Sequence, residues 1–154
     1  MAYTDIISLE RAKTYLRIDD TQNETDSEIN SMLIAAFRYV EKTTNIIFVA
    51  KDKLYDVVDG TVSVYDHPIN SEVTEGLESK KKRLYTIYCA PINVDTIELN
   101  VGYVDPLDID EDILELVLMI TKTMYYEQET DQSFKELLPS WAVETLNTNR
   151  RFIL

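Results

Sequence analysis

The chain is poor in the residues that most often carry out chemistry: it has one histidine, one cysteine and only three glycines among 154 residues. His67 and Cys89 cannot complete a zinc site, and neither has the partners that a nucleophilic relay needs. Three glycines in a whole chain cannot build a Walker loop or a dinucleotide-binding loop. We therefore expect no enzyme activity, no cofactor and no bound metal.

A single cysteine also excludes an intrachain disulfide and is typical of a reducing cytosol. Cys89 closes the apolar stretch TIYC, so we interpret it as a small buried residue at the end of a strand.

The chain contains only 4 prolines and 3 glycines, and it has neither internal repeats nor low-complexity tracts. This composition argues against long linkers or disorder. With 45% hydrophobic residues, a chain of this length is expected to form a single domain, residues 1–154, with a substantial core.

Alternating aspartates at 108, 110 and 112 begin like a calcium-binding loop. That motif requires glycine at its sixth position and glutamate at its twelfth, where this chain has Ile113 and Met119. The pattern therefore indicates a capped helix start rather than a calcium site.

No hydrophobic run is long enough to cross a membrane, which requires about 20 nearly uncharged residues. The most apolar stretch, 107–129, is interrupted by Glu115, Lys122, Glu127 and Glu129. The opening MAYTDIISLERAK has no continuous apolar core of the kind that a signal peptide needs. We expect a soluble protein that stays where it is made.

The net charge of −13 comes from 28 acidic and 15 basic residues. Because DNA affinity depends mainly on lysine and arginine displacing counterions, tight DNA binding is not expected, although DNA could pass such a surface without sticking. The basic cluster KKKR is either a solvated loop before a strand or a docking patch for an acidic partner; it comprises Lys80, Lys81, Lys82 and Arg83.

Apolar residues at helical spacing predict four helices, at about 9–17, 25–44, 111–128 and 140–147. Ser8 is a plausible N-cap of the first, and Thr25 with Glu28 forms a capping box before the second. Asn45 suits the left-handed residue that ends a helix. In the last helix, we expect Trp141 and Leu146 to point inward.

Between 46 and 104 the apolar period changes to two, which is typical of strands. The expected strands lie in NIIFVA, KLYDVV, TVSVY, RLYTIYC and VDTIELNVGYV, and Asp59-Gly60 is a strong hairpin signal. The expected fold is α+β and mainly α: a helical bundle with a small antiparallel β-sheet, about 46–104, inserted between the second and third helices.

The helix at 111–128 is almost entirely apolar from Ile113 to Met119, so it must be covered on nearly every side. We expect its inner faces to pack on the helices at 9–17 and 25–44.

The order of these elements resembles the head–tail connector (adaptor) proteins of tailed bacteriophages. Their first helix follows the pattern L-x-x-A-K-x-x-L-R-I-D, which residues 9–19 match. Their second follows D-x-x-I-x-x-x-I-x-A-A-x-x-Y-V-E-K-x-T, which residues 26–44 match with Leu33 in place of an isoleucine. The later strand and helix, 97–129, and the closing LPSWAVETLNTNRR are also similar, and the resemblance covers 7–48 and 97–150.

The resemblance implies a connector-type bundle that assembles into a ring of about twelve copies under the portal, joining the filled head to the tail. It implies as partners the portal and the tail or stopper proteins, and as locations the virion neck and, during assembly, the host cytoplasm. In such a ring, the neighbouring subunit would cover the rest of the helix at 111–128. Acids of the ring would line a channel that repels DNA, with Asp19, Asp20, Glu24 and Glu28 as candidates.

The segment RRFIL is expected to dock on the portal through Arg150, Arg151, Phe152, Ile153 and Leu154. Alternatively, its apolar residues fold back over the last helix, or the segment adds a strand to a sheet edge. Other readings of the whole chain are a neck stopper or tail-completion protein, and an acidic DNA mimic, against which RRFIL argues.

Overall fold

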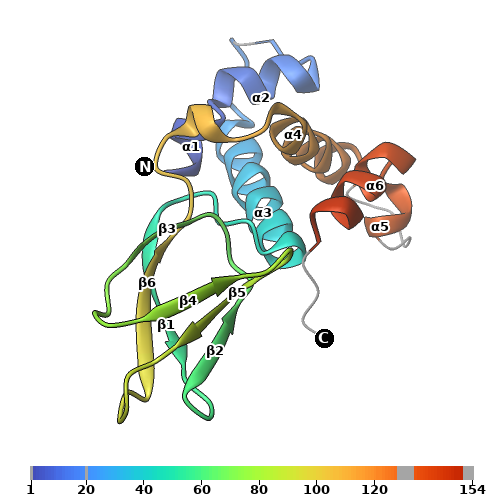
Figure 1. Cartoon of the computed structure of the whole chain (residues 1–154). Coiled ribbons are helices and arrows are strands. Elements are labelled where there is room, and N and C mark those ends of the chain that lie inside the picture. The colour runs from blue at the N-terminus through green and yellow to red at the C-terminus, as the bar shows by residue number, and fades with distance from the viewer. Residues whose placement is uncertain (1, 20, 128–133, 151–154) are drawn as a thin grey trace. The chain divides into compact units, whose positions relative to one another are not determined.

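The structure, a computed structural model, describes residues 2–19, 21–127 and 134–150. They form two compact units, which we name the helical unit (up to Thr44, and Asp105–Arg150) and the sheet unit (Asn45–Val104) (Figure 1). Helices and antiparallel strands are both present, so the predicted α+β class is confirmed.

The helical unit combines the two ends of the described chain. Its long helices correspond in order to the four that the sequence predicts. The elements are α1 (Tyr3–Ile6), α2 (Leu9–Leu16), α3 (Asp26–Thr44), the 3-10 helix η1 (Pro106–Asp108), α4 (Glu111–Tyr126), α5 (Phe134–Leu137) and α6 (Ser140–Asn149).

The helix caps follow the sequence signals only in part. Ser8 caps α2 as predicted, because its Oγ accepts a hydrogen bond of 3.1 Å from the backbone amide of Arg11. Asn45 has a φ of 60°, the left-handed conformation expected after α3. The predicted capping box is wrong, since the Thr25 hydroxyl is buried and has no hydrogen-bond partner in the described residues.

A buried ion pair fastens the start of α3 to α2. Lys13 is 3% exposed, and its Nζ donates to the Asp26 carboxylate and to the Gln22 carbonyl, each at 2.8 Å. The carboxylate of Asp26 is therefore fixed by Lys13 at the start of α3, where the helix dipole also favours it.

The short helix α1 lies against α3. The ring of Tyr3 stacks on that of Phe37 with centroids 4.9 Å apart, and its hydroxyl donates to Glu41 at 3.0 Å. Burial, together with the neighbouring Glu41 carboxylate, raises the pKa of Tyr3 to about 12.

The apolar helix α4 is covered within a single chain. It contacts α2, α3 and α6 (Figure 1), and its buried residues occur all around it: Ile113, Leu114, Leu116, Val117, Leu118, Ile120, Thr121 and Thr123. The expectation that a neighbouring subunit must cover these residues is therefore wrong, because α6 folds back to do so.

In the last helix the prediction that Leu146 points inward is confirmed, and the one that Trp141 does is wrong. Ala142 and Leu146, one turn apart, are buried, whereas Trp141 is 40% exposed. One position along a helix rotates a side chain by about 100°, so a face centred on Ala142 and Leu146 leaves Trp141 outside.

The sheet unit contains two three-stranded antiparallel sheets, where the sequence predicts one. The first has the order β1 (Lys51–Asp56), β6 (Thr96–Val101), β3 (Ile69–Glu72), and the second β2 (Thr61–Val64), β5 (Thr86–Cys89), β4 (Glu78–Lys81). Both contribute to one core cluster, which comprises Ile47, Val64, Tyr88, Ile97, Leu99 and Val101. The alternation predicted around residues 97–101 is confirmed.

The Asp59-Gly60 turn forms, but its flanking strands separate. Asp59 and Gly60 have φ values of 51° and 73°, and Val58 and Thr61 exchange two backbone hydrogen bonds of 2.9 and 3.0 Å. Beyond this bridge, β1 pairs with β6 and β2 pairs with β5. The turn thus passes the chain from one sheet to the other.

Both ends of the sheet unit lie side by side. Tyr103 donates its backbone amide to Ile47 at 3.1 Å and accepts from Ala50 at 3.1 Å. Gly102, with a φ of 110°, makes this approach possible, since a Cβ there would be 2.7 Å from the Val49 carbonyl oxygen. The stretch 45–50, expected as a strand, contributes only the isolated bridge between Ile46 and His67.

Truncating the core between α3 and α4 should destabilise the protein. Leu33 and Ile120 are both 0% exposed, so replacing either with alanine is expected to lower the free energy of unfolding by about 2–5 kcal/mol. Chemical denaturation measures this loss, with Ile92→Ala at a 92% exposed position as the control. A loss below about 0.5 kcal/mol at both core positions would contradict the packing.

Removing the buried ammonium of Lys13 tests the fastening of α3 to α2. Lys13→Met is expected to cost about 1–3 kcal/mol, because the Asp26 carboxylate and the Gln22 carbonyl lose their donor. Asp26→Asn keeps an acceptor at that position and should cost less. Equal stability of wild type and Lys13→Met in urea would show that the pair is energetically neutral.

Candidate assembly surfaces

The acidic loop between α2 and α3 and the first turn of α3, which holds Glu28, expose part of the predicted channel surface. Asp19, Glu24 and Glu28 are exposed, and Asp20 lies outside the described residues. The Asp19 carboxylate accepts hydrogen bonds from the Thr21 amide at 2.9 Å and hydroxyl at 2.7 Å. These bonds hold the pKa of Asp19 below its usual range.

The basic cluster lies partly on a strand rather than wholly in a loop. Lys80 and Lys81 belong to β4, an edge strand whose four residues are all exposed, and Lys82 and Arg83 follow in a turn closed by a 2.8 Å hydrogen bond from Lys82 to Tyr85. Lysines on an edge strand discourage unspecific pairing with other strands.

Arg150 is the last described residue of the predicted portal-docking segment. It is exposed and follows directly on α6, which ends at Asn149. Arg151, Phe152, Ile153 and Leu154 lie outside the described residues.

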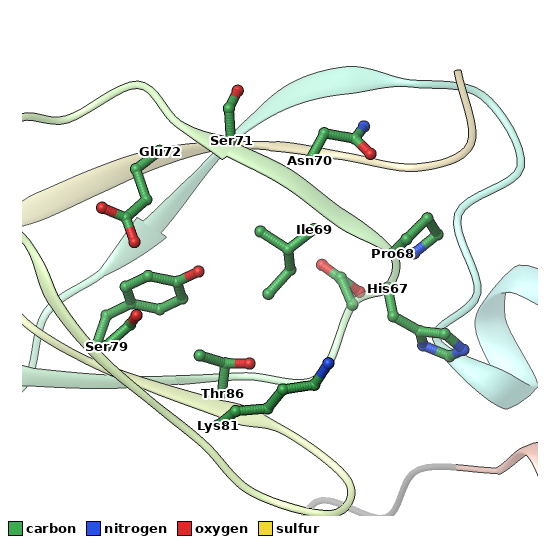
Figure 2. Close-up of a pocket in the computed structure, with 11 residues that line it drawn as sticks. His67, Pro68, Ile69, Asn70, Ser71, Glu72, Ser79, Lys81 and Thr86 are labelled. Atoms are coloured by element: carbon green, nitrogen blue, oxygen red, sulfur yellow. The ribbon is translucent and has the colours of Figure 1, made fainter. Parts of the chain in front are cut away.

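A groove of about 440 Å³ lies between the edges of the two sheets in the sheet unit. Figure 2 shows Ile69 and Glu72 of β3 on one side, facing a space that Ser79, Lys81 and Thr86 border on the other. Its volume falls in the range of binding pockets, about 300–1,000 Å³. No signal in the sequence analysis indicated this groove.

A buried carboxylate closes one part of the groove. Asp66 is 8% exposed and accepts hydrogen bonds from the Lys53 ammonium and the Tyr55 hydroxyl, both at 2.6 Å. Burial and the Asp66 carboxylate raise the pKa of Tyr55, so its hydroxyl remains a donor at neutral pH. Burial and the nearby Glu72 likewise raise the pKa of Tyr88.

Large apolar side chains are exposed on both units, which the sequence alone did not indicate. In the sheet unit, Val58 is 68% and Ile92 92% exposed, and their two loops are joined by a 3.0 Å hydrogen bond from Ala90 to Gly60. In the helical unit, Leu107 is 90% exposed.

The single cysteine and the single histidine lie apart from any metal-binding group in the described residues. No three histidine, cysteine, aspartate or glutamate side chains there gather as a metal site. Cys89, predicted to be buried, is exposed, because it ends β5 on the side away from the core. The Nδ1 of His67 lies 3.4 Å from the Tyr65 carbonyl oxygen.

The aspartates before α4 differ from the expected capping pattern. Asp110 occupies the N-cap position of α4 but makes no capping hydrogen bond through its side chain. Asp105 caps η1 instead, accepting from the Leu107 amide at 2.9 Å.

In the described part of the chain, no helix is long and apolar enough to span a membrane.

Two solved structures have folds similar to this chain, and both come from gene transfer agent (GTA) particles. A chain in the virion of a native GTA particle matches with a TM-score of 0.72 and 13% identity, over 97% of this chain and 92% of that one. A chain in the neck of an empty GTA particle, computed with C6 symmetry, matches with a TM-score of 0.71 and 12% identity, over 100% and 94%. At these identities the likeness concerns the fold.

No curated protein sequence matches the chain significantly. The sequence profile of the phage gp6-like head-tail connector proteins, however, matches residues 6–138, which include α2, α3, the whole sheet unit and α4. Such proteins are structural components of the virion at the head–tail junction and do not constitute an enzyme class. The chain therefore belongs to the phage gp6-like head-tail connector family.

Proposed function

We propose that this protein forms a ring of about twelve copies under the portal, where it joins the DNA-filled head to the tail. The observation that carries the proposal is the family match over residues 6–138. In this arrangement the helical and sheet units act together as one connector domain built on a helical bundle, with the portal on one side and tail or stopper proteins on the other.

The similar structures support a ring. One of them is a neck computed with C6 symmetry, and twelve copies are compatible with a sixfold axis. Neighbours in a ring would also cover exposed apolar side chains such as Leu107 and Ile92. Because α4 is already covered by its own chain, the folded subunit does not depend on the ring for its core.

Imaging this protein with its cognate portal tests the proposal directly. A ring stacked on the portal is the expected result. A ring that binds only to the tail side would favour the stopper or tail-completion alternative, and a monomer that binds a host DNA-binding protein would favour the DNA mimic.

We further propose that the acidic loop and the first turn of α3 face the channel, so that their carboxylates repel passing DNA. Asp19, Glu24 and Glu28 are exposed, and the hydrogen bonds from Thr21 hold the pKa of Asp19 below its usual range. Asp20 joins this proposed surface on its sequence alone. Asp26 contributes less charge, because it is paired with Lys13.

Changing Asp19, Glu24 and Glu28 together to lysine should make the channel retain DNA. Each new lysine attracts phosphates and displaces counterions, so the retention should weaken steeply with added salt. DNA ejection from assembled particles, measured over a salt series, checks this result. A control variant carries the same changes at three other exposed acids, Asp56, Asp108 and Glu144.

Normal ejection from particles carrying the first variant would remove the channel role from these three residues. Equal retention in the control variant would show that total charge matters rather than its position.

We also propose that residues 150–154 dock on the portal. Arg150 and Arg151 would pair with portal acids, and Phe152, Ile153 and Leu154 would fill apolar pockets. Burying Phe152 and Leu154 would each contribute about 1.5–3 kcal/mol before ordering costs, and the copies in a ring would add their contributions through avidity. The exposed cluster Lys80–Arg83 is a second candidate contact, for an acidic partner.

Deleting residues 150–154 should abolish portal binding and leave the melting temperature nearly unchanged. The deletion begins after the last residue of α6, Asn149, so the described helix remains complete. Thermal unfolding and co-sedimentation with portal rings measure the two effects. A large fall in melting temperature with portal binding intact would instead support a segment folded back over the protein.

A further inference from the structure

The strands β3 and β4 are neighbours in sequence but not in a sheet. Only residues 73–77 separate them, and strands joined by so short a connection usually pair as a hairpin. In the described residues, however, β3 pairs with β6 alone and β4 with β5 alone. Each therefore presents one unpaired backbone edge, and the groove lies between them.

The connection after β3 is fastened to the first sheet, which keeps the two strands apart. The backbone amides of Val73 and Thr74 donate to the Glu98 carbonyl at 3.0 and 3.2 Å. The Thr74 hydroxyl in turn accepts from the Glu98 amide at 2.8 Å. These bonds hold the connection against β6 of the first sheet.

The two edges of the groove differ in their suitability for pairing. The register of β3 shifts between Ile69 and Ser71, an irregularity of the kind that disrupts pairing. By contrast, β4 runs in regular register, with four consecutive residues opposite β5 and all four exposed. An added strand would therefore pair with β4.

Side chains give the groove an apolar centre and charged ends. Ile69 and Tyr88 line it, with Tyr88 4% exposed. Glu72 borders the groove near the end where residues 73–77 connect the strands, and Lys81 borders it at the opposite end of β4; both are exposed. Neither Glu72 nor Lys81 makes an ion pair with another described residue.

We propose that this groove accepts one extended segment of another neck protein, which adds to β4 as a strand. The segment carries a basic side chain beside Glu72, an apolar side chain over Ile69 and Tyr88, and an acidic side chain beside Lys81. Backbone pairing supplies affinity in such strand addition, and alternate side chains supply specificity. The lysines of β4 reject strands that lack the matching acid.

The choice of a different protein over a second copy rests on the proposed function. The edge strands that a second copy could add, β1 to β4, carry no basic, apolar and acidic residue together at alternate positions. Residues 150–154, which combine basic and apolar side chains, bind the portal in the proposed function. The groove is therefore available to the tail or stopper protein that follows in the neck.

A reversible block of the groove tests the proposal. Ser79 is exposed and borders the groove, and Ser63 on β2 is an exposed serine in the same sheet outside it. Ser79→Cys and Ser63→Cys are made in full-length protein that also carries Cys89→Ser. Both are modified with an aromatic disulfide reagent, and labelling is verified before use. Each is added to an extract of particles assembled without this protein, and tailed particles are counted by electron microscopy.

Modified Ser79→Cys is expected to form rings on the portal but to reduce tailed particles by about tenfold or more, which corresponds to about 1.4 kcal/mol of lost binding. Dithiothreitol should restore them, and modified Ser63→Cys should behave like wild type. Normal tailing with modified Ser79→Cys overturns the proposal. Failure of unmodified protein to form rings on the portal would instead overturn the proposed function.

Charge reversal and hydrogen exchange provide a second measurement. Glu72→Lys should reduce tailing, whereas Asp56→Lys on β1 makes the same charge change outside the groove and should not. Amides of β4 should gain protection from exchange only when the next neck protein is bound. Protection already present in rings of this chain alone, or on adding a peptide of residues 148–154, would assign the groove to a second copy and overturn the proposed occupant.

Discussion

The burial of α4 is the constraint on which the helical unit depends. A helix with apolar side chains on nearly every face must be enclosed by at least three neighbours, and α2, α3 and α6 provide them. Two of these neighbours precede the sheet unit in sequence and one follows it, so the chain must return after residue 104 to complete the enclosure. The ion pair of Lys13 with Asp26 and the bond from the Tyr126 hydroxyl to the Leu16 carbonyl, 2.7 Å, tie these elements at their ends.

Helices could be predicted from the sequence because their signals are local. Apolar spacing, Ser8 and Asn45 each act within one or two turns. Strands β1, β2, β5 and β6 could also be predicted, from their β-branched and aromatic residues. The other two strands and the division into two sheets could not, because β3 and β4 have polar, exposed sequences, INSE and ESKK, whose pairing depends on distant strands. The β-branched stretch 45–50 had the right composition for a strand but no second strand to pair with beyond one bridge.

Family membership could be recognised from ordered packing and capping patterns, yet those patterns say little about contact surfaces. The groove in the sheet unit is bordered by the two strands that composition does not identify, and the exposed Val58 and Ile92 look like core residues in the sequence. Which apolar side chains of a strand are exposed to water is decided by how the strands pair and by which face of the sheet is covered. Sequence reasoning thus locates the stable framework better than it locates the surfaces that meet partners.

The two ends of the sheet unit are hydrogen-bonded to each other, which makes the unit a replaceable module. Ile47 and Tyr103 are hydrogen-bonded neighbours, so the 55 or so residues between them could be exchanged for a shorter or longer insert while the chain still leaves and re-enters the helical unit at adjacent points. Under the proposed binding of the next neck protein to the groove, variation in this insert would change which neighbour is recognised without disturbing the enclosed helix. A connector lineage could in this way acquire a new tail by exchanging one insert, while the helices around α4 stay as they are.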